Sequence, residues 1–183
     1  MRLLLPHFGQ LPFHSGDRHM KNIVLIGMMG CGKSTCGRLL AERLDRELVD
    51  TDAFIEARQG RSIPDIFAQE GEAHFRALER EAAQDLAQRK GLVIACGGGL
   101  PIQEAAMEPL ARSGLVIFLE RDPADIFAHV SMVGRPLGRD GEAAFLERYA
   151  AREPIYRRRA DRAVPVQATP QETVDLILEG LEP

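Results

Sequence analysis

Short apolar runs alternate with longer amphipathic stretches along most of this chain. Five runs have the length and composition of strands, and they cover residues 23–26, 47–50, 92–96, 115–120 and, more weakly, 162–166. The stretches between them carry apolar residues at helical spacing. Alternating strands and helices predict an α/β fold, with a parallel sheet that is covered by helices on both faces.

Local signals also place helix boundaries. Ser62, followed by Pro64 and Asp65, is a capping pattern that predicts a helix start. This helix runs towards Gly71, where we expect a break or kink, and a second helix is expected over 72–90.

Composition and charge exclude several classes of protein. The 183 residues are 45% hydrophobic, which predicts one domain over 21–183, and residues 1–20 fit it so poorly that they suggest a disordered extension or tag. A net charge of −4 does not favour nucleic acid, and no apolar run approaches the roughly 20 residues of a membrane helix. Three cysteines without metal-ligand spacing suit a reduced cytoplasm. Without a heptad pattern, we expect a monomer.

A glycine-rich stretch between the first strand and the first helix carries the strongest chemical signal. Residues 27–34 read GMMGCGKS and fit the phosphate-binding loop of nucleoside triphosphatases. The expected nucleotide-binding residues are Gly30, Cys31, Gly32, Lys33, Ser34 and Thr35. Lys33 should reach the β- and γ-phosphates of ATP and Ser34 should ligate Mg²⁺. We interpret Cys31 as a tolerated small residue rather than a redox switch.

Two carboxylates, Asp50 and Asp52, close the second strand. Ligands of open parallel sheets bind beyond the carboxyl ends of the strands, so both should face the active cleft. Asp50 is expected to help hold Mg²⁺, and Asp52 to orient the acceptor hydroxyl or take its proton. Alternatively, Asp52 is the N-cap of a helical turn over 53–58.

Three glycines and an arginine–glutamate pair are candidates for the wall of the site that binds the phosphoryl acceptor. Gly97, Gly98 and Gly99 follow the third strand and could offer consecutive amides to an oxygen-rich ligand. Arg76 and Glu79 are three residues apart on a predicted helix. Spacing alone favours a surface ion pair, whereas the alternative is that Glu79 orients Arg76 to bind a carboxylate.

A basic, glycine-punctuated segment late in the chain resembles a lid. We expect a mobile loop over 135–141 and a helix over 142–159, with the lid at about 132–152. Arg135 and Arg152 are candidates for neutralising the transferring phosphoryl group and gripping an anionic acceptor. Other arginines of the segment are expected to be solvated helix charges: Arg139, Arg148, Arg157, Arg158 and Arg159.

Together these motifs resemble the shikimate kinase family over nearly all of residues 21–183. The similar segments are GMMGCGKST, LVDTD with IEARQGRSIPDIFAQEGEAHFRALE, ACGGG, GRPL and AAREPIYRR, in the family's order. The resemblance implies a five-stranded parallel kinase fold of the nucleoside-monophosphate-kinase type. It also implies transfer of the γ-phosphoryl group of ATP to the 3-hydroxyl of shikimate, with magnesium.

The resemblance also implies roles for particular residues. It implies that Asp52, Gly98, Arg76 and Arg152 bind shikimate, with the two arginines on its carboxylate. The resemblance therefore favours Arg76 as a ligand of the carboxylate over a surface ion pair with Glu79. It assigns Lys33 and Arg135 to the transferring phosphate and Ser34 with Asp50 to magnesium. One departure is the helix before the lid, where the family often has an arginine that stacks on adenine and residues 127–131 have none.

Two other functions remain open at this point. A different small-molecule kinase, acting on gluconate or a nucleotide, would share the phosphate-binding loop. A nucleotide-binding regulatory module without an acceptor would also share it. The set of Asp52, Arg76, Gly98 and Arg152 disfavours the other kinase, because a nucleotide acceptor would need a base-reading pocket. The same acceptor-side set argues against a regulatory module without an acceptor.

Overall fold

A five-stranded, all-parallel sheet forms the centre of the protein. The computed structural model describes residues 21–129 and 141–181. The predicted extension, the loop with Arg135 and much of the predicted lid therefore lie outside the described residues. The strands run in the order β2-β3-β1-β4-β5 and comprise β1 (Asn22–Ile26), β2 (Leu48–Asp50), β3 (Val93–Ala95), β4 (Gly114–Glu120) and β5 (Arg162–Pro165).

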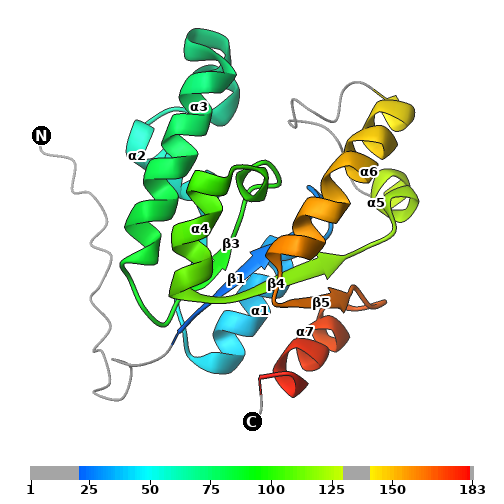
Figure 1. Ribbon diagram of the computed structural model, residues 1–183. Helices are drawn as coiled ribbons and strands as arrows, with labels where there is room; N and C mark the ends of the chain where they lie inside the picture. The colour runs from blue at the N-terminus through cyan, green and yellow to red at the C-terminus, as the bar shows by residue number, and fades with distance from the viewer. Residues whose placement is uncertain (1–20, 130–140, 182–183) are drawn as a thin grey trace, which may run out of the picture.

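Helices cover both faces of this sheet, as predicted (Figure 1). They are α1 (Lys33–Leu44), α2 (Thr51–Gln59), α3 (Ile63–Ala87), α4 (Glu104–Ser113), α5 (Pro123–His129), α6 (Gly141–Arg159) and α7 (Pro170–Glu179), with a 3₁₀ turn, η2, over Leu100–Ile102. Helices α1 and α7 pack together on one face, and α3, α4 and α6 lie on the other. No helix in the described parts of the chain is long and apolar enough to cross a membrane.

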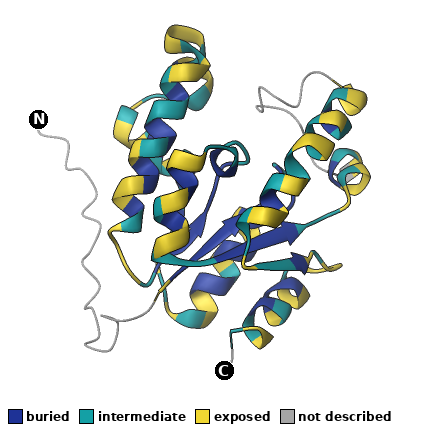
Figure 2. Ribbon diagram, viewed as in Figure 1, coloured by how far each residue is buried: buried dark blue, intermediate teal, exposed yellow. Residues whose placement is uncertain are grey.

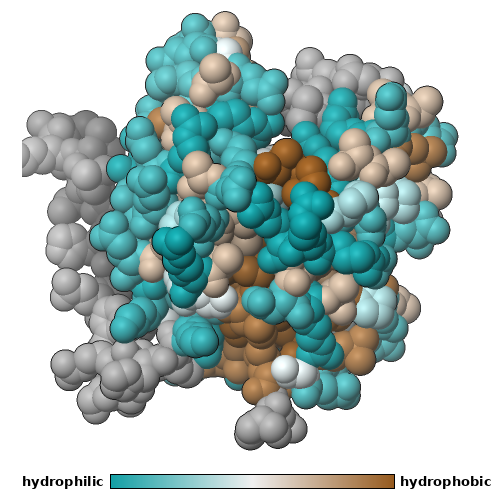
Figure 3. Space-filling model, in the orientation of Figure 1, coloured by the Kyte–Doolittle hydropathy of each residue, from teal (hydrophilic) through white to brown (hydrophobic). Residues whose placement is uncertain are grey.

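The main core lies between the sheet and its helices. All five residues of β1 are buried, as are the central residues of β4, which explains why these strands read as continuous apolar runs. Helices bury one side and expose the other (Figure 2). On the face shown in Figure 3 the helices present mostly hydrophilic residues, and apolar residues are visible mainly between them.

A second, smaller cluster joins α2 to α3. Gly71 has φ 78° and ψ 176° inside α3, which confirms the predicted kink. Phe75 and Leu78 follow the kink and pack with Ile55 of α2 and Ile66. The kink lets the two halves of α3 point in different directions, so that its second half passes the carboxyl ends of the strands. The helix ends at Ala87, earlier than the predicted residue 90.

Parallel pairing brings three loops to one edge of the sheet. Leu25 of β1 and Asp50 of β2 both align with Ala95 of β3. The glycine-rich loop, the Asp50–Asp52 segment and the Gly97–Gly99 segment therefore start side by side. This arrangement places the predicted nucleotide and acceptor residues at the same edge.

Candidate active site

A cavity of about 660 Å³ opens at the carboxyl ends of β1, β2 and β3. Of the predicted site residues, it is lined by Gly30, Gly32, Lys33, Ser34, Thr35, Asp50, Asp52, Arg76, Gly97, Gly98 and Gly99. Apolar residues of the kinked helix, including Ile63, Pro64, Phe67 and Phe75, form another part of its wall. The cavity is large enough for a small acceptor beside a triphosphate.

The glycine-rich loop curls around the Lys33 ammonium group. Gly27, Gly30 and Gly32 have φ values of 144°, 81° and 107°, which L side chains rarely adopt. Lys33 Nζ donates to the carbonyl oxygens of Gly27 at 2.9 Å and of Met28 at 2.8 Å, and only 8% of the residue is exposed. A buried cation in the concave face of a loop gives this end of the cavity a strong preference for anions.

Asp50 has two tasks in the structure. Its Oδ1 accepts from the backbone N–H groups of Asp52, at 3.0 Å, and Ala53, at 3.4 Å, and so caps α2. Its Oδ2 accepts from the Ser34 hydroxyl at 2.7 Å. The alternative that Asp52 is the N-cap is therefore wrong, because α2 begins at Thr51 and takes its cap from the preceding residue.

Ser34 and Asp50 together present oxygen ligands at the mouth of the phosphate-binding loop. Such hard ligands suit Mg²⁺, which usually takes one or two protein oxygens and completes its octahedron with phosphate oxygens and water. The described residues contain no group of three or more His, Cys, Asp or Glu side chains that could hold a metal ion by themselves.

Asp52 lies in the first turn of α2 and lines the cavity. Burial, and then the nearby Asp50 carboxylate, raises the pKa of Asp52 from 3.8 to about 6, although Lys33 and Arg76 act in the opposite direction. A carboxylate with a pKa near the working pH can accept a proton from a bound hydroxyl more readily than an ordinary aspartate.

Gly97 and Gly99 make room for charged side chains, whereas Gly98 lies against the backbone of the phosphate-binding loop. The Gly97 N–H donates to Thr51 Oγ1 at 2.8 Å, so the prediction of consecutive exposed amides is wrong for Gly97. A Cβ atom at position 97 would lie 2.3 Å from Asp52 Oδ1, and one at position 99 would lie 2.2 Å from Arg76 Nη1. Glycine is required here because the acid and the guanidinium pass so close to the backbone.

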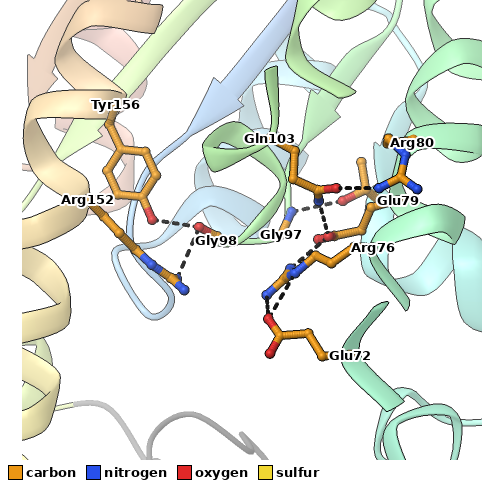
Figure 4. Close-up of polar contacts among 10 residues, drawn as sticks. Glu72, Arg76, Glu79, Arg80, Gly97, Gly98, Gln103, Arg152 and Tyr156 are labelled. Carbon is orange, nitrogen blue, oxygen red and sulfur yellow. Dashed lines mark hydrogen bonds and ion pairs between the residues drawn. The ribbon is translucent and has the colours of Figure 1, made fainter. Parts of the chain in front are cut away.

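Arg76 belongs to a buried polar network rather than a surface ion pair. Its Nη1 donates to Glu79 Oε2 at 2.7 Å, and Glu79 is only 1% exposed. The Nε and Nη2 atoms donate to Glu72 Oε1 at 3.1 and 2.7 Å. Gln103 Nε2 donates to the same Glu79 oxygen at 2.5 Å (Figure 4). The interpretation of a surface pair is wrong, and the alternative that Glu79 orients Arg76 fits the geometry.

Helix α6 approaches the other side of the glycine segment. The Tyr156 hydroxyl donates to the Gly98 carbonyl at 2.6 Å, and Arg152 Nη1 donates to the same oxygen at 3.4 Å (Figure 4). Arg152 thus contacts a residue of the cavity wall but does not itself line the cavity, and its role in binding the acceptor stays a prediction. Arg157 is exposed on α6, as predicted for a solvated charge, and forms ion pairs with Glu120 and Glu153.

Comparisons with known proteins decide the family. A family model described as shikimate kinase matches residues 29–182. The chain belongs to the shikimate kinase family. Its relatives include the shikimate kinase of Symbiobacterium thermophilum, 42% identical over 88% of this chain and 96% of the relative. Another is the shikimate kinase of Burkholderia lata, 38% identical over 88% of this chain and 90% of the relative.

A solved structure agrees with this family in fold as well as in sequence. Shikimate kinase from Acinetobacter baumannii, in complex with shikimate, has a TM-score of 0.85 and 35% identity over 89% of this chain and 93% of that chain. The predicted family, the P-loop kinase fold and the assignment as an enzyme are confirmed. Membership in a kinase family also implies the use of ATP.

The structure adds three residues to the site that sequence reasoning missed. Thr51 binds the Gly97 amide, Tyr156 binds the Gly98 carbonyl, and Gln103 binds Glu79. Thr51 and Tyr156 lie inside the segments that resemble shikimate kinases, so their position in those motifs was a usable signal. Gln103 lies outside all of them, and nothing in the sequence pattern marks it.

Proposed function

We propose that this protein transfers the γ-phosphoryl group of ATP to the 3-hydroxyl group of shikimate. The observation that carries the proposal is one cavity that joins a phosphate-binding loop to an aspartate and an oriented arginine. The Acinetobacter relative, whose structure contains shikimate, supports the choice of acceptor. In the same proposal the chain acts as a cytoplasmic monomer on a small-molecule substrate.

The acceptor end of the cavity suits a hydroxylated carboxylic acid. Arg76 offers a planar pair of donors for the carboxylate of shikimate, and Arg152 approaches from α6 to complete the grip. Asp52 accepts a hydrogen bond from the 3-hydroxyl group, which orients this oxygen for attack, and takes its proton as the phosphoryl group moves. Its raised pKa makes that proton transfer more favourable.

The nucleotide end of the cavity suits a magnesium-bound triphosphate. The loop N–H groups from Gly30 to Thr35 bind the phosphates, and Lys33 neutralises charge on the β- and γ-phosphates. Ser34 and Asp50 would hold Mg²⁺, directly or through water. When bound, the ion neutralises phosphate charge and orients the γ-phosphoryl group. Arg135, proposed from the sequence alone, adds a further cation to the transferring group.

Most of the rate enhancement in this proposal comes from positioning and charge. Phosphoryl transfer asks the protein for little covalent chemistry, because its main need is an aligned hydroxyl group and neutralised oxygens. The cavity supplies the first through Asp52 and Arg76 and the second through Lys33. A hydroxyl held in this way also competes with water for the phosphoryl group.

The direct test is ATP consumption in the presence of magnesium, with and without shikimate. Gluconate and nucleoside monophosphates serve as parallel acceptors. Saturable stimulation by shikimate alone supports the proposal. Stimulation by a different acceptor would support kinase activity but refute shikimate as the acceptor. Slow turnover that no acceptor changes would favour a regulatory nucleotide-binding module.

A further inference from the structure

Arg76 on α3, the proposed ligand of the acceptor carboxylate, is connected through Glu79 to a residue at the start of α4. We propose that Gln103 is a positioning residue for the reaction, whose side-chain amide fixes Glu79 and, through it, the Arg76 guanidinium. The proposal rests on the proposed function, since it takes Arg76 to bind the carboxylate of shikimate. Figure 4 shows Gln103 reaching from the start of α4 to the network on α3.

The orientation of the Gln103 amide follows from its two neighbours. Its Nε2 donates to Glu79 Oε2 at 2.5 Å, and its Oε1 accepts from Arg80 Nη1 at 3.2 Å. An arginine can only donate and an ionised carboxylate can only accept, so the amide has one orientation that satisfies both. The Glu79 carboxylate selects the amide N–H by itself, and the contact with Arg80 agrees with this orientation.

Glu79 depends on this second donor. Its side chain is 1% exposed, and burial raises its pKa, while the hydrogen bonds from Arg76 and Gln103 act in the opposite direction. Two donors converge on the same oxygen, Oε2, which locks the carboxylate plane. Without Gln103, Arg76 alone would have to hold a buried charge and its orientation.

Arg76 also forms hydrogen bonds with a second carboxylate. Glu72 accepts from its Nε and Nη2 atoms, but the Glu72 side chain is 61% exposed, so water screens its charge. Glu79 holds the opposite end of the guanidinium at the cavity. If Glu79 is held less firmly, the guanidinium shifts towards Glu72 and loses its alignment with the acceptor. A small misplacement of such a clamp is costly in rate.

The Gln103 side chain can be changed without disturbing the start of α4. Gln103 is the N-cap residue, but its side chain forms no capping hydrogen bond. The backbone carbonyl accepts from the N–H groups of Ala106 and Met107 instead. Substitutions of the side chain therefore leave the helix start intact, which separates positioning from folding.

The variants are Gln103→Met, which keeps the length and removes the donor, and Gln103→Glu, which replaces the donor by a second carboxylate. We expect KM for shikimate to rise about tenfold in the first and more in the second, as for a lost hydrogen bond to a charged group. KM for ATP should change little. The matched control, Arg80→Met, keeps the donor to Glu79 and should change KM for shikimate much less.

A double-mutant cycle with Arg76→Lys separates positioning from a general structural effect. If Gln103 acts through the guanidinium, Gln103→Met has little further effect on KM once Arg76 is replaced. The same fold-change in both backgrounds would overturn the proposal. So would a normal KM for shikimate in Gln103→Met, which has no donor at this position.

A readout without substrate keeps this inference separate from the proposed function. The Nε–H NMR signal of Arg76, assigned by its loss in Arg76→Lys, should shift in Gln103→Met and stay in place in Arg80→Met. A shifted signal in an enzyme that shikimate does not stimulate would support positioning and refute the acceptor. An unchanged signal would refute positioning, whatever the acceptor is.

Discussion

Asp52 should make the folded protein less stable at neutral pH than an uncharged side chain would. Its pKa lies at about 6 in the folded protein, above its ordinary value of 3.8. A raised pKa means that the protonated form stabilises the fold fully below about pH 4. This contribution is lost as the pH rises from about 4 to 6. The substitution Asp52→Asn keeps the shape and cannot ionise, so it avoids the loss.

The magnitude follows from the shift in pKa. A difference of about 2 units corresponds to about 3 kcal/mol, at 1.36 kcal/mol for each unit. The Asp52 side chain borders the open cavity, where water screens part of this cost, so we expect about 2 kcal/mol. For a domain of this length that corresponds to an increase in Tm of roughly 4–8 °C.

The assay is thermal unfolding of the nucleotide-free protein between pH 4 and 8. Asp52→Asn should unfold at nearly the same temperature as the parent protein at pH 4 and at a higher temperature at pH 7.5. Glu81→Gln is the control, because it removes the charge of an exposed carboxylate on α3 that does not line the cavity. A gap in Tm that is the same at every pH would refute the electrostatic reasoning.

The same variant tests the role of Asp52 in the reaction. Phosphoryl transfer should fall at least about a hundredfold, the lower end of acid–base contributions, while ATP binding persists. Near-normal turnover of Asp52→Asn would show that the acid neither orients the hydroxyl nor takes its proton. Greater stability with lost activity is the combination that the structure predicts.

Three further substitutions test other parts of the site. Gly99→Ala places a Cβ 2.2 Å from Arg76 Nη1, so the guanidinium must shift. KM for shikimate should then rise at least tenfold while KM for ATP stays near normal. Equal changes in both KM values would contradict the proposed carboxylate site. Tyr156→Phe leaves the Gly98 carbonyl without its 2.6 Å bond and should cost about 1–2 kcal/mol in denaturant unfolding, whereas an unchanged midpoint would mean that the bond adds nothing. Arg135→Ala should lower kcat far more than ATP affinity, and weaker ATP binding with normal kcat would exclude Arg135 from the transferring phosphate.

The helices and strands were predictable because their signals are local. Each strand differs from its prediction by at most a residue at either end, since a buried strand needs a continuous apolar run. The kink at Gly71 was predictable for the same reason, because only a glycine readily adopts φ 78° inside a helical pattern. The helix that contains Gly71 ended three residues early, in a region where no packing signal marks the boundary.

Site residues were predictable where a motif carries them. Most of the phosphate-binding loop, Asp50, Asp52 and the three glycines reach the cavity, because parallel strands bring their carboxyl ends to one edge. Cys31 of the loop is buried and does not line the cavity. The capping role given to Asp52 belongs to Asp50, because the helix starts earlier than the pattern suggested. Arg135 lies outside the described residues, and its role stays a prediction.

The sequence by itself determined the class of chemistry, and the tertiary structure decided how the side chains share it. Glycine spacing, apolar runs and neighbouring carboxylates act over a few residues, so they can be read along the chain. Glu79 is buried, and its hydrogen bond from Gln103 joins residues that are 24 positions apart. The hydrogen bond from the Gly97 N–H to Thr51 joins residues that are 46 positions apart. No local pattern specifies such partners, because the packing of α4 against α3 and of β2 beside β3 brings them within reach.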